Sequence, residues 1–184
     1  MPTATTIIPA GTWTADPAHS TLGFSVKHLG IATVRGKFAT FNGTLTLADD
    51  LAGAQFAATI DAASVSTAEE GRDAHLRSAD FFDVENYPTL EFRSTAVTPR
   101  GGDAFTIQGT LSMHGVTQPV ELTAEVQGTE IDPWGNQRVG LEITGELSRA
   151  AYGIAFNQVL GSGNLAVSDK VKLSLDISAV RQAA

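Results

Sequence analysis

The sequence predicts an all-β domain of about eight antiparallel strands, closed into a barrel or packed as a sandwich. Apolar and polar residues alternate with a period of two along most of the chain, which is typical of strands with one solvated face. Turn residues separate the alternating segments, and no regular succession of strands and long helices indicates a parallel sheet.

The clearest strand covers residues 22–28. Its even positions, Leu22, Phe24, Val26 and His28, alternate with small or polar residues at the odd positions. The same alternation predicts half-buried strands over residues 105–113, 120–126, 139–147 and 171–177.

Residues 34–47 alternate as well, but the apolar positions change from even to odd on the way. Val34 and Phe38 are followed by Phe41, and a β-bulge near Ala39 or Thr40 would explain the change. Further strands are predicted at residues 56–60 and 90–92, with turns at residues 49–50, 99–103 and 132–136.

Residues 67–87 are the one long segment for which we see no alternation. Residues 67–70 (TAEE) match a capping box, so a short helix should begin there and continue through residues 71–78. Residues 79–87 follow neither period and contain Phe81 and Phe82. We expect this helix and loop, called the flap below, to cap one end of the barrel.

Length and composition indicate one globular domain. The 184 residues include 42% hydrophobic residues, enough to bury a core, so we expect a single domain over residues 12–184 after a loose segment 1–11. The net charge of −8 should repel nucleic acid and, for the chain as a whole, anionic lipid headgroups. No apolar run approaches the ~18 residues of a membrane-spanning helix.

The first ten residues, MPTATTIIPA, lack the basic and apolar regions of a secretory signal. A cytoplasmic location is therefore expected for the chain as written. The sequence has no Cys, which excludes disulfides but does not fix the compartment.

Four blocks of the sequence occur in the order found in one protein family. Residues 13–20 (WTADPAHS), residues 36–38 (GKF), residues 72–84 (RDAHLRSADFFDV) and residues 109–117 (GTLSMHGVT) resemble motifs of YceI-like proteins. The third block is the most specific. The resemblance covers about residues 12–180, nearly the whole chain.

The resemblance implies an extended, lipocalin-like barrel of eight antiparallel strands. Proteins of this family hold an amphiphile with a polyisoprenoid chain in an apolar tunnel, have no established general catalytic activity, and are often periplasmic. Our leading hypothesis is therefore the non-enzymatic binding, sequestration or transport of a polyisoprenoid lipid, such as a quinone-like compound or a prenyl phosphate.

Apolar side chains on the inward faces and on the flap are the candidate ligand contacts, although each could equally belong to an ordinary core. They are Phe24, Val26, Phe38, Phe56, Ile60, Phe81, Phe82, Leu90, Phe92, Leu111 and Met113. Small residues at inward positions could leave room for a ligand or instead mark bends and close strand packing. They are Gly36, Ala58, Gly109, Ala124, Gly145 and Ala179.

Three polar residues are candidates for contact with the head of a ligand. His28 has the inward parity of its strand, while Arg72 and His75 lie on the flap and could meet a phosphate or a hydroxyl. Alternatively, Arg72 or Arg77 pins the flap through an ion pair with an acidic residue, either Asp73, Asp80 or Asp83.

The sequence predicts no metal, no cofactor and no catalytic residue. Its four histidines share no ligand spacing, and His114 is expected to be exposed or to support a turn. Residues 161–166 match a dinucleotide-binding pattern, but a strand rather than a helix follows. Asp16, His19 and Ser20 lie too close along the chain to suggest a catalytic relay.

Two other function classes stay open. The first is an enzyme that acts on a prenyl lipid with His28, His75 and Arg72 as acid, base and anion-stabilising groups. The second is a stress-response protein that works through a partner or as a homodimer, associating along exposed barrel edges.

Overall fold

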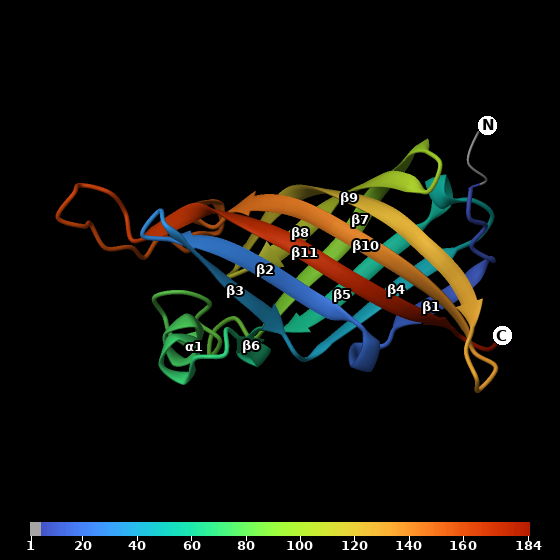
Figure 1. Ribbon diagram of the computed structural model, residues 1–184, viewed down its shortest axis with the longest axis horizontal. Helices are drawn as coiled ribbons and strands as arrows, with labels where there is room; N and C mark the ends of the chain where they lie inside the picture. Colours follow the sequence, from blue (N-terminus) through green and yellow to red (C-terminus); the bar gives the residue numbers. More distant parts are fainter. Residues whose placement is uncertain (1–4) are drawn as a thin grey trace.

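The computed structural model describes residues 5–184 as a closed antiparallel barrel of eight strands with one short helix (Figure 1). The helix, α1, covers Glu70–Arg77. The strands are β1 (Gly11–Ala15), β2 (Thr21–His28), β3 (Ala32–Phe38), β4 (Phe41–Leu47), β5 (Gln55–Asp61), β6 (Val65–Ser66), β7 (Thr89–Gly101), β8 (Ala104–Met113), β9 (Val116–Ile131), β10 (Gln137–Ser148) and β11 (Val167–Arg181). The predicted fold class is confirmed.

Eleven strand segments form eight barrel strands because the first three barrel strands are each interrupted by a short turn. The turn Pro17–His19 separates β1 from β2, and Ala62–Ser64 separates β5 from β6. In the second barrel strand, residues 39–40 separate β3 from β4. The expected β-bulge near Ala39 or Thr40 is thus a break in the strand, which changes the facing parity in the same way.

The barrel is closed by β11, which pairs with both halves of the first barrel strand. Trp13 of β1 lies opposite Arg181, whereas Thr21 of β2 lies opposite Asp176, and β10 occupies the other edge of β11. Closure leaves few free edges. Among the described residues, the part of β3 before Lys37 pairs with β2 alone.

The end of the barrel remote from α1 is filled by side chains. Trp13, Phe105 and Val139 have no exposed surface, and the indole of Trp13 donates a hydrogen bond to the Pro9 carbonyl, 3.1 Å away. Ile8 is buried in the same cluster. The N-terminal segment expected to be loose is therefore packed from Ile8 onward, while residues 1–4 lie outside the described residues.

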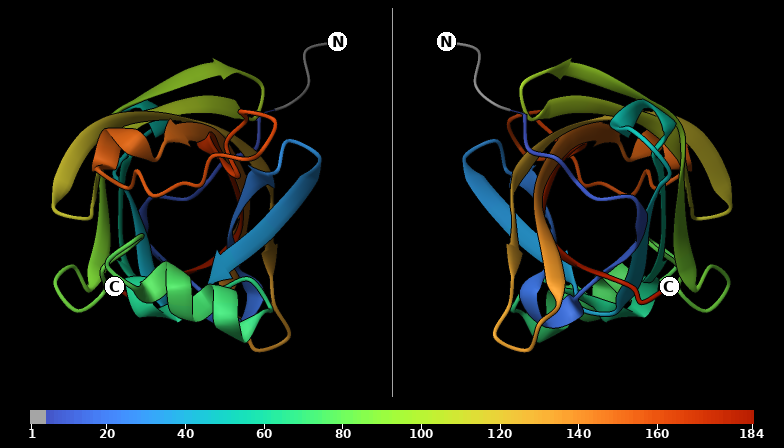
Figure 2. Two further views of the ribbon diagram at one scale, coloured as in Figure 1. Left: turned by 90° about the vertical axis from the view of Figure 1, so that its left-hand side faces the viewer. Right: turned by 90° about the vertical axis from the view of Figure 1, so that its right-hand side faces the viewer.

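The helix α1 lies along one side of the opposite end of the barrel (Figure 2). It begins later than the predicted capping box, because the side chain of Glu69 caps it by accepting hydrogen bonds from the backbone N–H groups of Gly71 and Arg72. Within residues 5–184, no helix has both the length and the apolar character needed to cross a bilayer.

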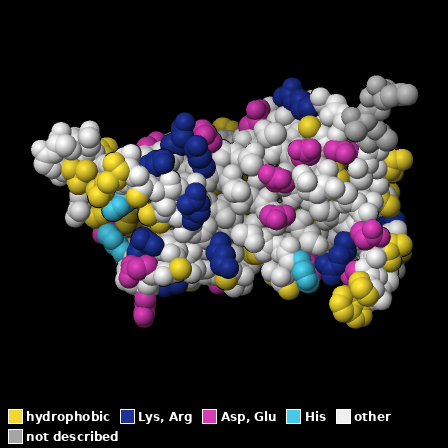
Figure 3. Space-filling view, viewed as in Figure 1, with side chains coloured by type: hydrophobic (Ala, Val, Ile, Leu, Met, Phe, Trp, Pro, Cys, Tyr) yellow, Lys and Arg dark blue, Asp and Glu magenta, His cyan; other side chains and the backbone are white. Residues whose placement is uncertain are grey.

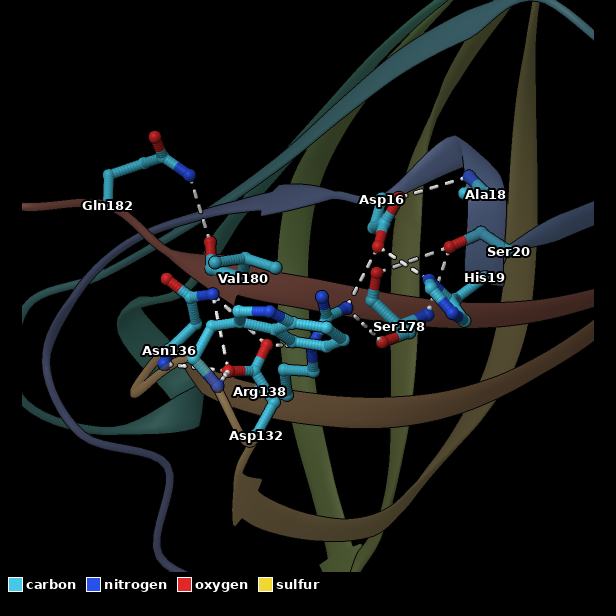
Figure 4. Close-up of polar contacts among 11 residues, drawn as sticks. Asp16, Ala18, His19, Ser20, Asp132, Asn136, Arg138, Ser178, Val180 and Gln182 are labelled. Carbon is cyan, nitrogen blue, oxygen red and sulfur yellow. Dashed lines mark hydrogen bonds and ion pairs between the residues drawn. The ribbon is translucent and has the colours of Figure 1, made fainter.

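A polar cluster ties the break in the first barrel strand to β10 and β11 (Figure 4). Arg138 lies between two carboxylates, with Nε 2.8 Å from Asp132 Oδ2 and Nη1 2.9 Å from Asp16 Oδ2. His19 Nδ1 is 2.7 Å from the same Asp16 oxygen. Hydrogen bonds from Arg138 and His19 lower the pKa of Asp16 to about 2.

We expect Arg138→Gln to lower the melting temperature and to raise the pKa of Asp16 toward the ordinary value of about 4. A depressed carboxylate pKa stabilises the fold above the unfolded pKa and loses this effect as the pH falls through the folded value. The difference in melting temperature between wild type and variant should therefore shrink between about pH 5 and about pH 2. Thermal melts across this range and carboxyl NMR titration would measure both effects. Arg93→Gln, at an exposed arginine of β7, is the control, and an equal loss in the control would contradict the assignment.

Candidate functional site

An apolar cavity of about 260 Å3 runs inside the barrel, between the filled end and the flap. An engineered apolar cavity of roughly 150 Å3 already binds benzene, so this space can hold a substantial hydrocarbon. Along β11 it is lined by every second residue, from Val171 to Ala179. At roughly 3.3 Å per residue, these positions extend over about 26 Å of strand, so the cavity is elongated.

The cavity opens toward the end that carries the flap. Phe24, Val26 and Val171 line it near this end and are partly exposed, whereas Ile107 and Leu141 line it near the filled end and are buried. Partial exposure of inward-facing apolar side chains is unusual for a packed core, and it marks the hollow part of the barrel.

All the apolar residues predicted as ligand contacts line this cavity. They are Phe24, Val26, Phe38, Phe56, Ile60, Phe81, Phe82, Leu90, Phe92, Leu111 and Met113. The wall also includes apolar residues of β10 and β11 that were not among the predicted contacts, although they have the same inward parity. They are Leu141, Ile143, Leu147, Val171, Leu173, Leu175 and Ile177.

The three predicted polar contacts are outside the cavity wall. His28 is exposed at the end of β2, opposite Ala32 and Val167, and it is not among the residues that line the cavity. His75 on α1 is also exposed, and its Nε2 lies 2.8 Å from Asp80 Oδ2. The structure does not bring His28, Arg72 and His75 together in one site.

Arg72 fixes the start of the flap, but with a different partner from the one expected. Its Nε donates to the Thr67 hydroxyl at 2.7 Å and its Nη2 to the Thr67 carbonyl at 3.0 Å. Arg77 similarly donates to the carbonyls of Ala63 and Val65. Among the described residues, neither arginine forms the predicted ion pair with Asp73, Asp80 or Asp83.

Asp73 is buried beneath this network and accepts hydrogen bonds from both the backbone N–H and the hydroxyl of Thr67, at 2.7 and 2.6 Å. Burial alone would raise the pKa of Asp73. The two hydrogen bonds and the charges of Arg77 and Arg72 outweigh burial and lower the pKa instead. Asp73 is therefore ionised at neutral pH and holds the flap in place.

The inner side of the flap forms part of the cavity wall. Leu76, Phe81 and Phe82 line the cavity, and the Phe82 ring meets Phe38 edge-on with centroids 5.6 Å apart. On the outer side, the rings of His75 and Phe81 contact Phe156, at 4.9 and 5.4 Å. Phe156 belongs to a second segment, so two covering segments meet at this aromatic cluster.

The second segment covers residues 149–166, between β10 and β11. The expectation that the flap is the one long non-alternating segment is therefore wrong. Arg149 at its start is only 7% exposed. Its guanidinium donates to four backbone carbonyls, at 2.9 to 3.3 Å, which belong to Ile154, Phe156, Val167 and Ser168.

Arg149 is the one ionisable side chain among the lining residues described here. Burial lowers its pKa, although the charge of Asp169 opposes this effect. No carboxylate of the described residues lies within ion-pair distance of the guanidinium. The apolar wall therefore carries a buried positive charge that forms no direct ion pair within the described part of the chain: four backbone carbonyls bind it, and the charge of Asp169 stabilises it from a longer distance.

Tyr152 adds a second polar group near the same end. Its hydroxyl is buried without a hydrogen-bond partner among the described residues, and burial raises its pKa. The ring packs in a cluster with Leu111 and Met113, which line the cavity. His114 supports the neighbouring turn, as predicted, with Nδ1 2.9 Å from the Tyr152 carbonyl oxygen and a φ of 55°.

The inward glycines do not leave room for a ligand. A Cβ on Gly36 would lie 2.4 Å from Cζ of Phe24, one on Gly109 would lie 2.7 Å from the Phe92 ring, and one on Gly145 would lie 2.6 Å from a Leu122 methyl. Neighbouring side chains thus fill these places, which supports the alternative of close packing. Ala58 and Ala179 line the cavity, and Ala124 is buried in the filled end.

The described residues show no arrangement typical of a metal site or a catalytic relay. Nowhere in residues 5–184 do three His, Asp or Glu side chains converge as metal ligands would. The Ser20 hydroxyl donates a hydrogen bond to the Ser178 carbonyl at 3.2 Å. Among the described residues, no hydrogen bond joins the side chains of Ser20 and His19.

The sequence pattern that defines the YceI-like domain matches residues 13–179. The chain belongs to the YceI-like family. Two relatives of this YceI-like chain are UPF0312 proteins. The one from Vibrio cholerae is 34% identical over 166 residues, covering 90% of this chain and 84% of the relative. The one from Photorhabdus laumondii is 36% identical over 165 residues, covering 89% and 82%.

Solved structures of similar proteins share the barrel. The YceI protein of Campylobacter jejuni has a TM-score of 0.72 and 27% identity, covering 91% of this chain and 96% of its own. Burkholderia cenocepacia BcnA has a TM-score of 0.77 and 21% identity, covering 89% and 98%. At that identity the second likeness shows the fold alone.

We expect Gly36→Ala to displace the Phe24 ring into the cavity of this YceI-like protein. Overpacking of this kind costs about 1–3 kcal/mol, and the displaced ring should weaken uptake of an apolar fluorescent probe. Thermal melts and probe titration would measure the two effects. The control is Gly140→Ala, since Gly140 is not among the cavity-lining residues and a Cβ there meets its nearest neighbour, the Gln127 Cβ, at 3.4 Å. Equal probe uptake by a folded Gly36→Ala variant would contradict the expected displacement.

Proposed function

We propose that this protein binds one long polyisoprenoid chain in the cavity and sequesters or carries it without changing it chemically. The observation that carries this proposal is the shape and chemistry of the cavity. It is elongated and apolar along its length, and its single ionisable lining residue, Arg149, lies near the open end. This arrangement suits a linear hydrocarbon whose polar head stays at the opening.

Burial of the chain supplies enough free energy for binding. Each methylene removed from water contributes about 0.8 kcal/mol, although ordering and association costs offset a large part of the sum. A wall of Leu, Ile, Val and Phe side chains fits a branched prenyl chain by shape. It offers little to a compact polar substrate.

A structural relative supports the class of ligand. A domain from Saccharophagus degradans described as polyisoprenoid-binding has a TM-score of 0.70 and covers 92% of this chain. Its 18% identity establishes a shared barrel only. The prenyl ligand is therefore our inference, based on the cavity of this chain together with the shared fold.

We further propose that the head of the ligand is anionic or carries a strongly polar oxygen, as in a prenyl phosphate or a quinone-like ring. The buried guanidinium of Arg149 takes the role that the sequence suggested for Arg72, because it lines the cavity and Arg72 does not. A negative oxygen near it would form a direct ion pair, which Arg149 lacks among the described residues.

The affinity for prenyl alcohols should rise with chain length. We expect about a tenfold gain per added isoprene unit until the chain fills the cavity, and then a plateau. Titration with alcohols of two to five isoprene units would measure this gain. Native mass spectrometry should recover each alcohol at its supplied mass, and a changed mass would contradict a purely binding role.

A matched pair of variants tests whether the chain lies in the cavity. Leu173 of β11 lines the cavity, while the next residue, Ser174, is exposed on the outer face. Leu173→Asn should abolish uptake and Ser174→Asn should preserve it, with circular dichroism confirming that both fold. Equal uptake by two folded variants would place the ligand elsewhere.

Arg149 should distinguish a prenyl phosphate from the corresponding alcohol. Arg149→Met should weaken the phosphate by about 1.5–3 kcal/mol more than the alcohol, and Arg149→Lys should retain part of that preference because it keeps the charge. Calorimetry with both ligands would measure the difference. If Arg149 only fixes residues 149–166, both ligands weaken alike in both variants.

A further inference from the structure

Two loops at the open end expose large apolar side chains. Ile31, in the turn between β2 and β3, is 84% exposed, and Leu29 lies beside it. Val159 and Leu165, in the connection between β10 and β11, are 73% and 55% exposed. We call these four residues the apolar tips.

The apolar tips form one surface, because the two loops are joined by hydrogen bonds. The Leu29 N–H donates to the Ala166 carbonyl at 2.8 Å, and Val159 and Leu165 form a β-bridge with each other. Residues 153–168 contain no charged residue, although much of this segment is exposed. An exposed loop of this length without charge is unusual for a surface that contacts water alone.

A band of positive charge lies directly behind the apolar tips. Exposed lysines and arginines occupy the outer faces of β2, β3 and β11. The strands β2 and β3 contain no acidic residue, whereas Lys170 of β11 lies 3.2 Å from Glu146 of β10. We call this group the basic band, and it consists of Lys27, Arg35, Lys37, Lys170 and Lys172. Figure 3 shows Lys and Arg side chains gathered behind an apolar end of the molecule.

This local charge is opposite in sign to the net charge of −8. The opposite end of the barrel also exposes a large apolar side chain, but the turn that carries it contains no lysine or arginine. Trp134 is 81% exposed there, in a turn flanked by Glu130 and Asp132. Asp132 is paired with Arg138, but Glu130 is exposed and residues 129–137 contain no Lys or Arg. An anionic surface would therefore not attract Trp134, whereas it would attract the tips at the open end.

We propose that the open end is a docking surface for lipid bilayers with anionic headgroups. The apolar tips enter the interfacial region while the basic band contacts the headgroups, which is the combination that holds peripheral proteins on membranes. The expected repulsion of anionic lipid headgroups is thereby limited to the rest of the surface. The flap at the same end carries exposed carboxylates, among them Glu70, Asp80 and Glu85, and salt screens their repulsion.

Docking in this orientation would place the mouth of the cavity at the bilayer. Val26 and Val167 line the cavity, and they lie next to the basic band and the apolar tips along the chain. A prenyl chain could then pass between bilayer and cavity without crossing bulk water. This role for the surface rests on the proposed function, whereas binding to vesicles does not.

Flotation of the unliganded protein with vesicles tests the proposal. The protein should bind vesicles of phosphatidylcholine that contain about 30% phosphatidylglycerol, because this anionic lipid gives the vesicle a negative surface potential. Binding to phosphatidylcholine alone should be at least about tenfold weaker, and salt should weaken binding to the anionic vesicles. Absence of binding to the anionic vesicles would overturn the proposal.

Three variants locate the surface. Ile31→Glu with Val159→Glu alters the apolar tips, and Lys27→Gln with Arg35→Gln and Lys172→Gln neutralises part of the basic band. Each set should reduce vesicle binding at least about tenfold. Trp134→Glu makes the same kind of change at the opposite end and should leave binding unchanged. Equal loss with Trp134→Glu, or undiminished binding in the first two sets, would overturn the assignment.

Two further measurements separate this proposal from its alternatives. Uptake of a prenyl alcohol delivered in detergent should be unchanged in the tip and band variants, so a failure of docking can be told from a failure of lipid binding. Sedimentation velocity should show that Ile31→Glu with Val159→Glu leaves the oligomeric state unchanged. Dissociation of a dimer by this variant would show that the apolar tips bind a second copy of the chain instead of a membrane.

Discussion

The structure depends on one pairing constraint, which is that β11 must form hydrogen bonds with both β1 and β2. The first barrel strand breaks at residues 17–19, and both of its halves pair with β11, which closes the ring. The polar cluster around Arg138 holds this break, and closure removes most of the free edges through which a β-sheet aggregates. An internal space exists because the sheet is closed.

The same barrel is filled at one end and hollow at the other. Aromatic and branched side chains around Trp13 and Phe105 close the far end. Toward the flap, inward positions on β2 and β11 carry apolar side chains that do not meet across the barrel, and a cavity results. The two covering segments meet through Phe81 and Phe156, so the cover at this end combines segments that are far apart in the sequence.

The distribution of charge also differs between the filled end and the hollow end of the barrel. The net charge is negative, yet the outer faces of β2 and β3 carry lysines and arginines and no acidic residue, and residues 29–31 and 153–166 carry no charge. A buried cation, Arg149, lies at the same end inside the wall. Under our proposals, the regions that contact the apolar tail, the polar head and the membrane surface would therefore follow one another along the barrel axis.

The sequence by itself determined the strands, their inward faces and the apolar cavity wall. Alternation with a period of two is a local property, so the inward positions of Phe24, Phe92 and Leu111 could be predicted before the barrel was known. The family motifs added the closed topology and suggested the class of ligand that we propose.

Tertiary structure alone decided which polar residues contact one another and whether the inward glycines leave space for a ligand. Arg149 gave no local signal, because its importance comes from four carbonyls in residues that fold back around it. Arg72 and His75 looked suited to a ligand, but neighbouring Thr67 and Asp80 satisfy them. Parity indicated that Gly36 faces inward, but only the packed structure showed that Phe24 fills its place, because parity fixes the face of a residue and not its neighbours.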